Sequence, residues 1–199
     1  MPEASVVRPA VQETEWIEEL DIVPGQSENI REIELMEKQI RKRPSHWRLR
    51  LQLAQAYASD GNFHAAARHL RKCLDLVSDP AVVAGVFFNL GICFENVNNW
   101  REAASAYEQS LFLLPNLFWG RYKLGTCWMR LGEWRLAIEE LRHAVALDDQ
   151  QPECFRALRD ALQRAGMSKE AGEAHSRLLE LHPVQTPGGS PGGSFPQVN

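Results

Sequence analysis

The side chains that most often catalyse reactions or bind metals are scattered along this chain. The closest pair of histidines, His64 and His69, is five positions apart, which places the two imidazoles poorly on one face of a helix. The chain contains no Gly-rich phosphate loop and no HExxH zinc motif. The cysteines are far apart in the sequence, without a CxxC pair, in apolar helical stretches. We therefore expect a protein that is not an enzyme, with no catalytic residue, no metal site and no cofactor, and with four buried thiols, Cys73, Cys93, Cys127 and Cys154.

The composition limits the class of protein. The 199 residues are 44% hydrophobic and 24% charged, proportions typical of a globular chain with one or two domains. A formal net charge of −4 argues against nucleic acid as a partner, because duplex binding requires concentrated Lys and Arg. The longest apolar stretch, residues 81–88, is far shorter than the ~20 residues of a transmembrane helix. Because the first residues also lack the apolar region of a secretory signal, we expect a cytoplasmic protein without a transmembrane segment.

The elements that would position a site recur along the chain. Alanines at a nearly constant interval mark the second helix of each unit, at Ala66, Ala103, Ala137 and Ala171, and the first interval is three positions longer than the other two. Leucines mark the first helix of each unit. In three units the leucine is followed by a small residue and then by an aromatic residue: Leu53 with Ala54 and Tyr57, Leu90 with Gly91 and Phe94, and Leu124 with Gly125 and Trp128. In the fourth unit Arg159 follows Leu158 instead of a small residue. Between the two helices stand Gly61, Asn98, Gly132 and Gly166, residue types that accept a left-handed backbone at a helix end.

These residues resemble the tetratricopeptide repeat (TPR) family, whose unit of about 34 residues is a helix-turn-helix with a leading Leu-Gly and an alanine in its second helix. Residues 84–115 keep nearly all of these features, and residues 118–151 lack only the closing proline. Residues 47–79 are followed by three extra residues, and residues 152–183 place Arg159 where a small residue is usual. The resemblance implies an all-α fold with four repeats, a TPR-type α-solenoid whose antiparallel helix pairs form a right-handed superhelix with a concave groove.

Three segments flank the four units. Residues 27–44 carry apolar side chains at helical spacing, which predicts an N-terminal capping helix on the first unit. Residues 1–12 lack periodicity, and residues 184–199 are rich in Gly, Pro and Ser, so we expect both to be disordered.

The third flanking segment, residues 13–26, mixes apolar and acidic side chains. Between Glu13 and Glu37 there are nine acidic residues and one basic residue. We interpret it as an acidic-apolar docking segment that binds the groove of its own chain, binds a neighbouring copy and so causes self-association, or binds a separate partner. The alternative is a short extra helix packed on the capping helix. The residues expected to anchor the segment are Trp16, Ile17, Leu20 and Ile22.

The resemblance implies that the first helix of each unit lines the groove. Large apolar side chains there would form an exposed patch of the kind that marks binding sites, although some of them could belong to the core between repeats. Trp, Tyr and Arg are also the usual hot-spot residues of interfaces. The groove residues implied in this way are Leu51, Gln55, Phe88, Asn89, Ile92, Glu95, Trp119, Tyr122, Lys123, Met129, Arg130, Arg156 and Arg164.

Some members of the family grip the C-terminal carboxylate of a chaperone with Lys and Asn at fixed groove positions. Asn89 and Lys123 fall on two of these positions, but Leu51 and Gln55 replace the Lys and Asn of the first unit. The clamp is therefore incomplete, and binding of a carboxylate tail is a minor alternative.

The resemblance and the groove residues together favour a non-enzymatic protein-protein interaction module. We expect it to act as a scaffold or adaptor that binds a peptide or helix of a partner through apolar anchors. Three alternatives stay open: a TPR chaperone or assembly factor that shields a hydrophobic partner segment, a structural subunit of a large complex, and an enzyme with an unrecognised site.

Overall fold

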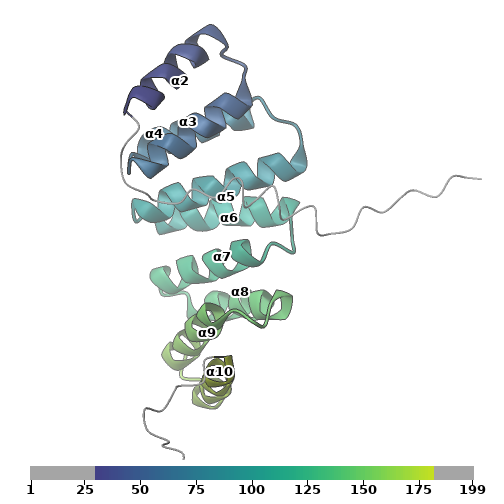
Figure 1. Cartoon of the computed structure of the whole chain (residues 1–199). Coiled ribbons are helices and arrows are strands. Elements are labelled where there is room, and N and C mark those ends of the chain that lie inside the picture. The colour runs from purple at the N-terminus through teal and green to yellow at the C-terminus, as the bar shows by residue number, and fades with distance from the viewer. Residues whose placement is uncertain (1–29, 182–199) are drawn as a thin grey trace, which may run out of the picture.

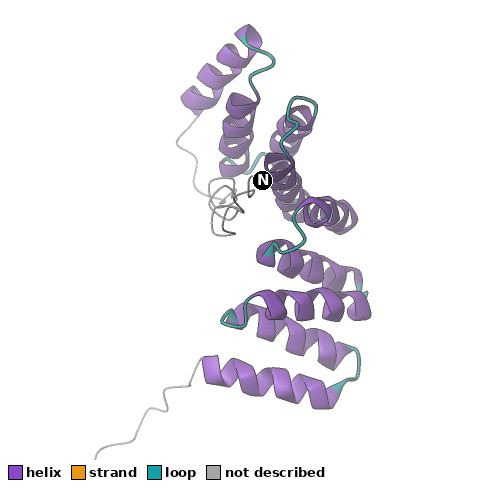
Figure 2. Ribbon diagram, turned by 90° about the vertical axis from the view of Figure 1, so that its right-hand side faces the viewer, coloured by secondary structure: helices purple, strands orange, loops and turns teal. Residues whose placement is uncertain are grey.

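The structure is a computed structural model that describes residues 30–181. These residues form nine α-helices and no strand, stacked along one axis (Figures 1 and 2). Each helix packs mainly against its neighbours in the chain, so the architecture is a solenoid of antiparallel helix pairs. The helices are α2 (Ile30–Lys42), α3 (Trp47–Ser59), α4 (Phe63–Leu74), α5 (Pro80–Asn96), α6 (Trp100–Leu113), α7 (Phe118–Leu131), α8 (Trp134–Leu147), α9 (Pro152–Arg164) and α10 (Ser168–Leu181). None of these helices combines the length and the apolar content that crossing a bilayer requires.

Residues with a left-handed backbone make the turns inside each helix pair. Gly61, Gly132 and Gly166 have φ angles of 77°, 80° and 77°, and Asn98 has a φ of 58°. Glycine adopts this conformation without a Cβ clash, and asparagine is among the few other residues that tolerate it. The prediction of left-handed turns at these four positions is confirmed.

Small residues allow the two helices of a pair to approach closely. A Cβ atom added at Gly91 in α5 would lie 2.5 Å from Cε1 of Tyr107 in α6. At Gly125 in α7 the same atom would lie 2.7 Å from Cγ of Leu141 in α8. In the last pair, Arg159 occupies the corresponding position and turns its guanidinium to the neighbouring Asp160 carboxylate, 2.6 Å away.

Helix α2 covers the apolar side of the first pair. Its buried residues Ile33, Met36 and Ile40 pack against Leu53 of α3. The Tyr57 hydroxyl donates a hydrogen bond to Oε1 of Glu37 at 2.5 Å and so fixes α3 to α2. The described helix begins at Ile30, and the first three residues of the predicted capping helix lie outside the described residues.

The three extra residues between the first two units lengthen α5. Ten residues of α5 precede Leu90, whereas six residues precede the corresponding leucine in α3, α7 and α9. The insertion is therefore absorbed as one additional helical turn, residues 80–83, at the start of α5. Asp79 caps this turn by accepting a hydrogen bond from Ala81 N–H at 2.9 Å, and Pro80 occupies its first position. Helix α5 consequently begins four residues before the expected unit of residues 84–115.

Candidate functional site

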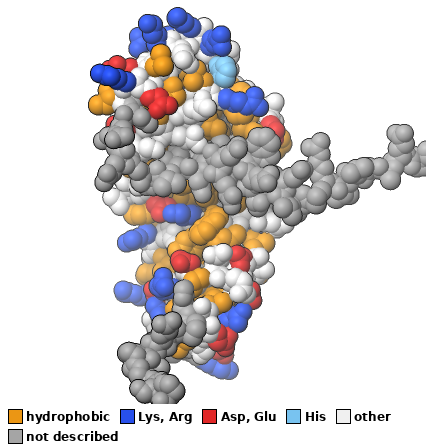
Figure 3. Space-filling model, viewed as in Figure 1, with side chains coloured by type: hydrophobic (Ala, Val, Ile, Leu, Met, Phe, Trp, Pro, Cys, Tyr) orange, Lys and Arg blue, Asp and Glu red, His pale blue; other side chains and the backbone are white. Residues whose placement is uncertain are grey.

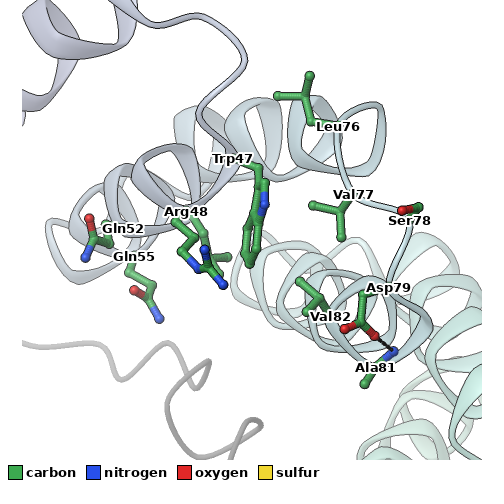
Figure 4. A pocket seen from close by; sticks show the side chains of 11 residues that line it. Trp47, Arg48, Gln52, Gln55, Leu76, Val77, Ser78, Asp79, Ala81 and Val82 are labelled. Atoms are coloured by element: carbon green, nitrogen blue, oxygen red, sulfur yellow. Dashed lines mark hydrogen bonds between the residues drawn. The ribbon is translucent and has the colours of Figure 1, made fainter.

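The additional turn of α5 borders a hollow of about 500 Å³ between α3 and α5. Trp47 projects from the start of α3 into the space opposite Val77 and Val82, with Leu76 at the upper edge (Figure 4). The Arg48 guanidinium lies 4.6 Å from the centroid of the Trp47 ring. The hollow thus combines apolar walls with a cation at its edge. Its other lining residues are Leu51, Gln52, Gln55, Ser78, Asp79 and Ala81.

This hollow was largely missed at the level of the sequence. Leu51 and Gln55 are the two predicted groove residues that line it, whereas Trp47, Val77 and Val82 were not predicted as site residues. One feature of the sequence indicated an unusual surface here. The interval between Ala66 and Ala103 is longer than the later intervals, and an insertion between two repeats alters the surface beside it.

A second hollow, of about 540 Å³, lies between α7 and α9. Its lining includes Thr126, Trp134 and the acidic residues Glu153 and Asp160, the latter paired with Arg159. Five of the predicted groove residues come together here: Tyr122, Met129, Arg130, Arg156 and Arg164.

Aromatic rings hold two of the arginines around this second hollow. The Arg130 guanidinium lies 5.3 Å from the centroid of the Trp100 ring, and that of Arg164 lies 5.9 Å from the Trp134 ring. Stacking of this kind orients a guanidinium without neutralising its charge. Arg130, Arg156 and Arg164 form no ion pair with a carboxylate of residues 30–181. The surface between α7 and α9 therefore presents cations that are available to an acidic ligand.

The start of α7 carries a cluster of three aromatic rings. Trp119 packs edge-on against Phe118, with ring centroids 5.0 Å apart, and edge-on against Tyr122 at 5.8 Å. Phe118 and Tyr122 stack in parallel at 6.4 Å. Trp119 is nevertheless 41% exposed. A large ring that is held by two neighbours and still faces solvent is a preorganised contact for a ligand.

Other apolar groove residues are not exposed. Phe88 is 2% exposed and packs against Tyr107 with ring centroids 5.5 Å apart, while Leu51 and Ile92 are buried in the same core cluster. The expectation that Phe88 and Ile92 extend the exposed patch is wrong. Both side chains are in α5, where they contribute to the core between repeats. The exposed apolar part of the predicted groove is thus concentrated on α7.

Asn89 is also fully buried, and neither atom of its amide group has a hydrogen-bond partner among the described residues. A buried amide without partners costs free energy, typically ~1 to 3 kcal/mol.

Lys123 is not a free cation in the groove. Its Nζ lies 3.1 Å from Oε1 of Glu95, and the other oxygen of Glu95 accepts a hydrogen bond from the Tyr107 hydroxyl at 2.8 Å. Burial raises the pKa of Tyr107 well above its usual value, so the hydroxyl stays protonated and able to donate. Because Glu95 already pairs with Lys123, a carboxylate tail would have to displace it. The arrangement disfavours the carboxylate clamp considered above.

The cysteines are free and buried, as predicted. Burial raises the pKa of each thiol to about 12, which leaves negligible thiolate at neutral pH. Within residues 30–181, no three His, Cys, Asp or Glu side chains are grouped closely enough to hold a metal ion. The predicted docking anchors Trp16, Ile17, Leu20 and Ile22, and the expected disordered ranges 1–12 and 184–199, lie outside the described residues.

Two curated proteins share sequence similarity with the chain. One is the tetratricopeptide repeat-containing protein trd-1 of Caenorhabditis elegans, 26% identical over 123 residues, which cover 62% of this chain and 16% of that protein. The other is the photosystem I assembly protein Ycf3 of Acaryochloris marina, 33% identical over 90 residues, which cover 45% of this chain and 54% of that protein. The matched region therefore spans about half or less of each relative's length.

Solved structures share the fold. MamA from Desulfovibrio magneticus RS-1 superposes with a TM-score of 0.70 at 20% identity, covering 77% of this chain and 85% of the other. YrrB, described as a TPR protein with an unusual peptide-binding site, gives a TM-score of 0.66 at 23% identity, covering 77% of each chain. The sequence profile of the tetratricopeptide repeat matches residues 49–84 and 86–116. Residues 30–181 therefore have the fold of a tetratricopeptide repeat solenoid, and the family's sequence profile matches its first two units.

Proposed function

We propose that the chain is a non-enzymatic interaction module that binds a segment of a partner protein along the side of α3, α5, α7 and α9. The observation that carries this proposal is Trp119, which is 41% exposed although Phe118 and Tyr122 hold its ring in place. Tryptophan is among the residue types most enriched in interface hot spots, and a ring that is already ordered loses little entropy on binding.

The charges beside Trp119 suggest what the partner segment carries. Arg130, Arg156 and Arg164 line the neighbouring hollow, with Arg130 and Arg164 oriented by tryptophan rings. Opposite charge accelerates encounter, whereas buried apolar contacts slow dissociation. We therefore expect a peptide or helix with an apolar anchor next to Trp119 and with acidic side chains toward α9. The module would act as a scaffold or adaptor in the cytoplasm.

A variant of Trp119 tests this function. The full chain is immobilised, and proteins captured from an extract of the source organism are quantified by mass spectrometry for wild type, Trp119→Ala and Leu136→Ala. Leu136 is the matched control, since it is 43% exposed on α8, a second helix outside both hollows.

We expect Trp119→Ala to lower capture of the main specific partner at least ~10-fold, the effect of losing a hot-spot residue. Leu136→Ala should change capture less than ~2-fold. Circular dichroism must show equal helicity for the three proteins. Equal capture by wild type and Trp119→Ala would place the binding surface elsewhere.

A second candidate function is that of an assembly factor. It is favoured by the similarity to a protein named as a photosystem I assembly protein, which is 33% identical over 90 residues. A scaffold and an assembly factor use the same groove but differ in what happens to the partner. Co-expression of the captured partner with the chain separates them. An assembly factor should convert an insoluble partner into a soluble one and be missing from the finished complex, whereas a scaffold should remain bound.

A further inference from the structure

We propose that the hollow between α3 and α5 is an anchor pocket for one large apolar side chain of a partner protein, flanked in the partner sequence by carboxylates. The pocket is separate from the Trp119 surface of α7. The inference rests on the proposed function, because it names a second part of the partner segment that the same side of the solenoid would hold.

The walls of the pocket determine the apolar part of the ligand. Trp47, Val77 and Val82 face one another across the space, and Leu76 is 37% exposed at its edge (Figure 4). The walls belong to α3 on one side and to the lengthened start of α5 and its preceding loop on the other. At about 500 Å³, the hollow falls within the range of pockets that bury small ligands, and it can accept a side chain as large as an indole.

Hydrogen bonds hold the start of α3, which carries Trp47, and the partly buried Trp47 side chain packs on the core cluster. The carbonyl oxygen of Trp47 accepts a hydrogen bond from the Cys73 thiol at 3.5 Å. The buried Arg50 donates from Nε and Nη2 to the Pro44 carbonyl at 2.9 and 2.6 Å, which orders the chain entering α3. The pocket is consequently preformed at its α3 side, and a ligand need not order it on binding.

Cations at the edge of the pocket determine the charged part of the ligand. Lys42, Arg43 and Arg48 line an adjoining hollow that shares Trp47 and Arg48 with the pocket. None of the three pairs with a carboxylate of residues 30–181. The Asp79 carboxylate lines the pocket too, but it is engaged as the cap of α5. Lys and Arg side chains also gather at the α2 end of the molecule (Figure 3).

The charge of the solenoid favours an acidic partner over a second copy of the solenoid. Residues 30–181 contain 21 Lys and Arg against 19 Asp and Glu, whereas residues 1–29 contain seven acidic residues and one basic residue. An acidic segment is complementary to this end of the solenoid, and the solenoid surface of another copy is not. We commit to a segment of a different protein as the occupant. The chain's own residues 13–25 also combine acidic and apolar side chains, so the experiment must distinguish binding of this segment from binding of a partner protein.

The test is a fluorescence-anisotropy titration of the full chain with the labelled peptide GEEWEEG, compared with GEEAEEG and GKKWKKG. We expect GEEWEEG to bind, and each of the other two peptides to bind at least ~10-fold more weakly, because one lacks the anchor and the other reverses the charge. Arg48→Glu should weaken GEEWEEG at least ~5-fold and strengthen GKKWKKG. Leu76→Ser should weaken GEEWEEG at least ~3-fold.

Matched controls exclude general effects. Leu147 occupies the position in the third unit that Leu76 occupies in the first and is similarly exposed, at 41%. Arg101 is an exposed arginine on α6. Leu147→Ser and Arg101→Glu should change GEEWEEG affinity less than ~2-fold. Leu136→Ala, on α8 outside both hollows, should leave it unchanged as well. The proposed function is tested by partner capture with Trp119→Ala and the pocket by peptide binding with Arg48→Glu and Leu76→Ser, so failure of one is distinguishable from failure of the other.

Four outcomes overturn the proposal. In the first, GEEWEEG and GEEAEEG bind equally or neither binds. In the second, Arg48→Glu and Leu76→Ser have no effect. In the third, the full-length variant Trp16→Ala/Leu20→Ala binds GEEWEEG at least ~10-fold more tightly than wild type, which would identify the chain's own segment as the occupant. In the fourth, sedimentation shows a dimer that Arg48→Glu converts to a monomer, which would identify a second copy.

Discussion

The first two repeat units differ from the last two in how consistently their residues fit the fold. Within residues 30–181, every buried polar side-chain atom without a partner belongs to the first two units, at His69, Asn89 and Ser110. The joint between these units also carries the three-residue insertion, whereas the later units follow each other at a constant interval. Residues 118–181 instead combine regular spacing with exposed Trp119 and unpaired groove arginines.

This difference suggests that the two halves contribute to binding in different ways. The second half offers rigid aromatic and cationic contacts on a regular scaffold. The first half departs from the repeat pattern and lowers its own stability, and such departures in natural proteins concentrate at functional sites. Substitutions in the two halves should therefore differ in their effects on stability.

Replacing the glycine in the first helix of a repeat with alanine should lower the free energy of unfolding more in the second unit than in the third. We expect Gly91→Ala to lower the free energy of unfolding by about 3 kcal/mol, because the new Cβ would lie 2.5 Å from the fully buried Tyr107 ring. Moving that ring would also disturb its hydrogen bond to Glu95. Gly125→Ala should cost less, about 1 kcal/mol, since the added Cβ would lie 2.7 Å from Cγ of the Leu141 side chain, a smaller overlap than that with the Tyr107 ring. Urea denaturation measures the free energy of unfolding of both variants.

Gly172→Ala in α10 is the control for this pair. Nothing lies within 4 Å of a Cβ added there, so the substitution should stabilise the helix by about 0.5 to 1 kcal/mol. A cost at Gly125 as large as that at Gly91 would contradict the difference proposed between the halves.

The first half should lose stability on mild acidification. His69 is buried and stacks on Tyr57 at 5.5 Å; burial, and then the charges of Arg68, Arg50 and Lys72, lower its pKa to about 4. In the unfolded chain the pKa is about 6.5, so below that pH the unfolded state binds the proton first and stability falls. Between pH 7 and pH 5 we expect a loss of about 2 kcal/mol.

The measurement is the unfolding free energy at pH 7, 6 and 5 for wild type, His69→Leu and His143→Gln. His69→Leu should flatten the profile, whereas His143→Gln, which replaces an exposed side chain in the second half, should retain the wild-type slope. If the unfolding free energy of His69→Leu still falls with pH as steeply as that of wild type, His69 is not the cause of the loss of stability.

Equivalent groove positions should respond to leucine with opposite signs. Asn89→Leu removes a buried amide without partners, so we expect it to stabilise the fold by about 1 kcal/mol. Lys123→Leu removes the ion pair with Glu95 and should destabilise it by about 0.5 kcal/mol. Thermal unfolding of both variants checks this. A destabilising effect of Asn89→Leu would contradict the expected difference in sign.

The smallest effect is expected at Ser110. Its hydroxyl is buried without a partner among the described residues, and the equivalent position in the next unit is Ala144. Ser110→Ala should therefore stabilise by about 0.5 kcal/mol, and Ala144→Ser should destabilise by at least as much. Differential scanning calorimetry can resolve this pair, and equal shifts of the same sign would contradict the comparison.

Local rules were enough to predict much of the fold. A glycine or asparagine at each left-handed turn, and a small residue in the first helix of the first three units, recur at a nearly constant interval, because each unit packs on the next in a similar way. The buried cysteines followed from their apolar surroundings. These features depend on residues near one another in the repeat, so sequence spacing alone reveals them.

The site depends on contacts between units, which spacing does not determine. Phe88 and Trp119 both belong to the first helix of their unit, but Phe88 packs against Tyr107 and Trp119 remains exposed. Lys123 matched a clamp position, yet its partner Glu95 comes from the preceding unit. The pocket at Trp47 depends on where an insertion is absorbed, and a lengthened interval between alanines does not reveal whether the loop or the helix takes it up.

The most direct test of the central claim is hydrogen–deuterium exchange of the full chain with and without the captured partner. Backbone amides covered by a ligand exchange more slowly. We expect the partner to protect peptides from α3, α5, α7 and α9, with the strongest protection around Trp119 and the start of α5. Protection confined to α4, α6, α8 and α10 would place the partner on the opposite face and contradict the account.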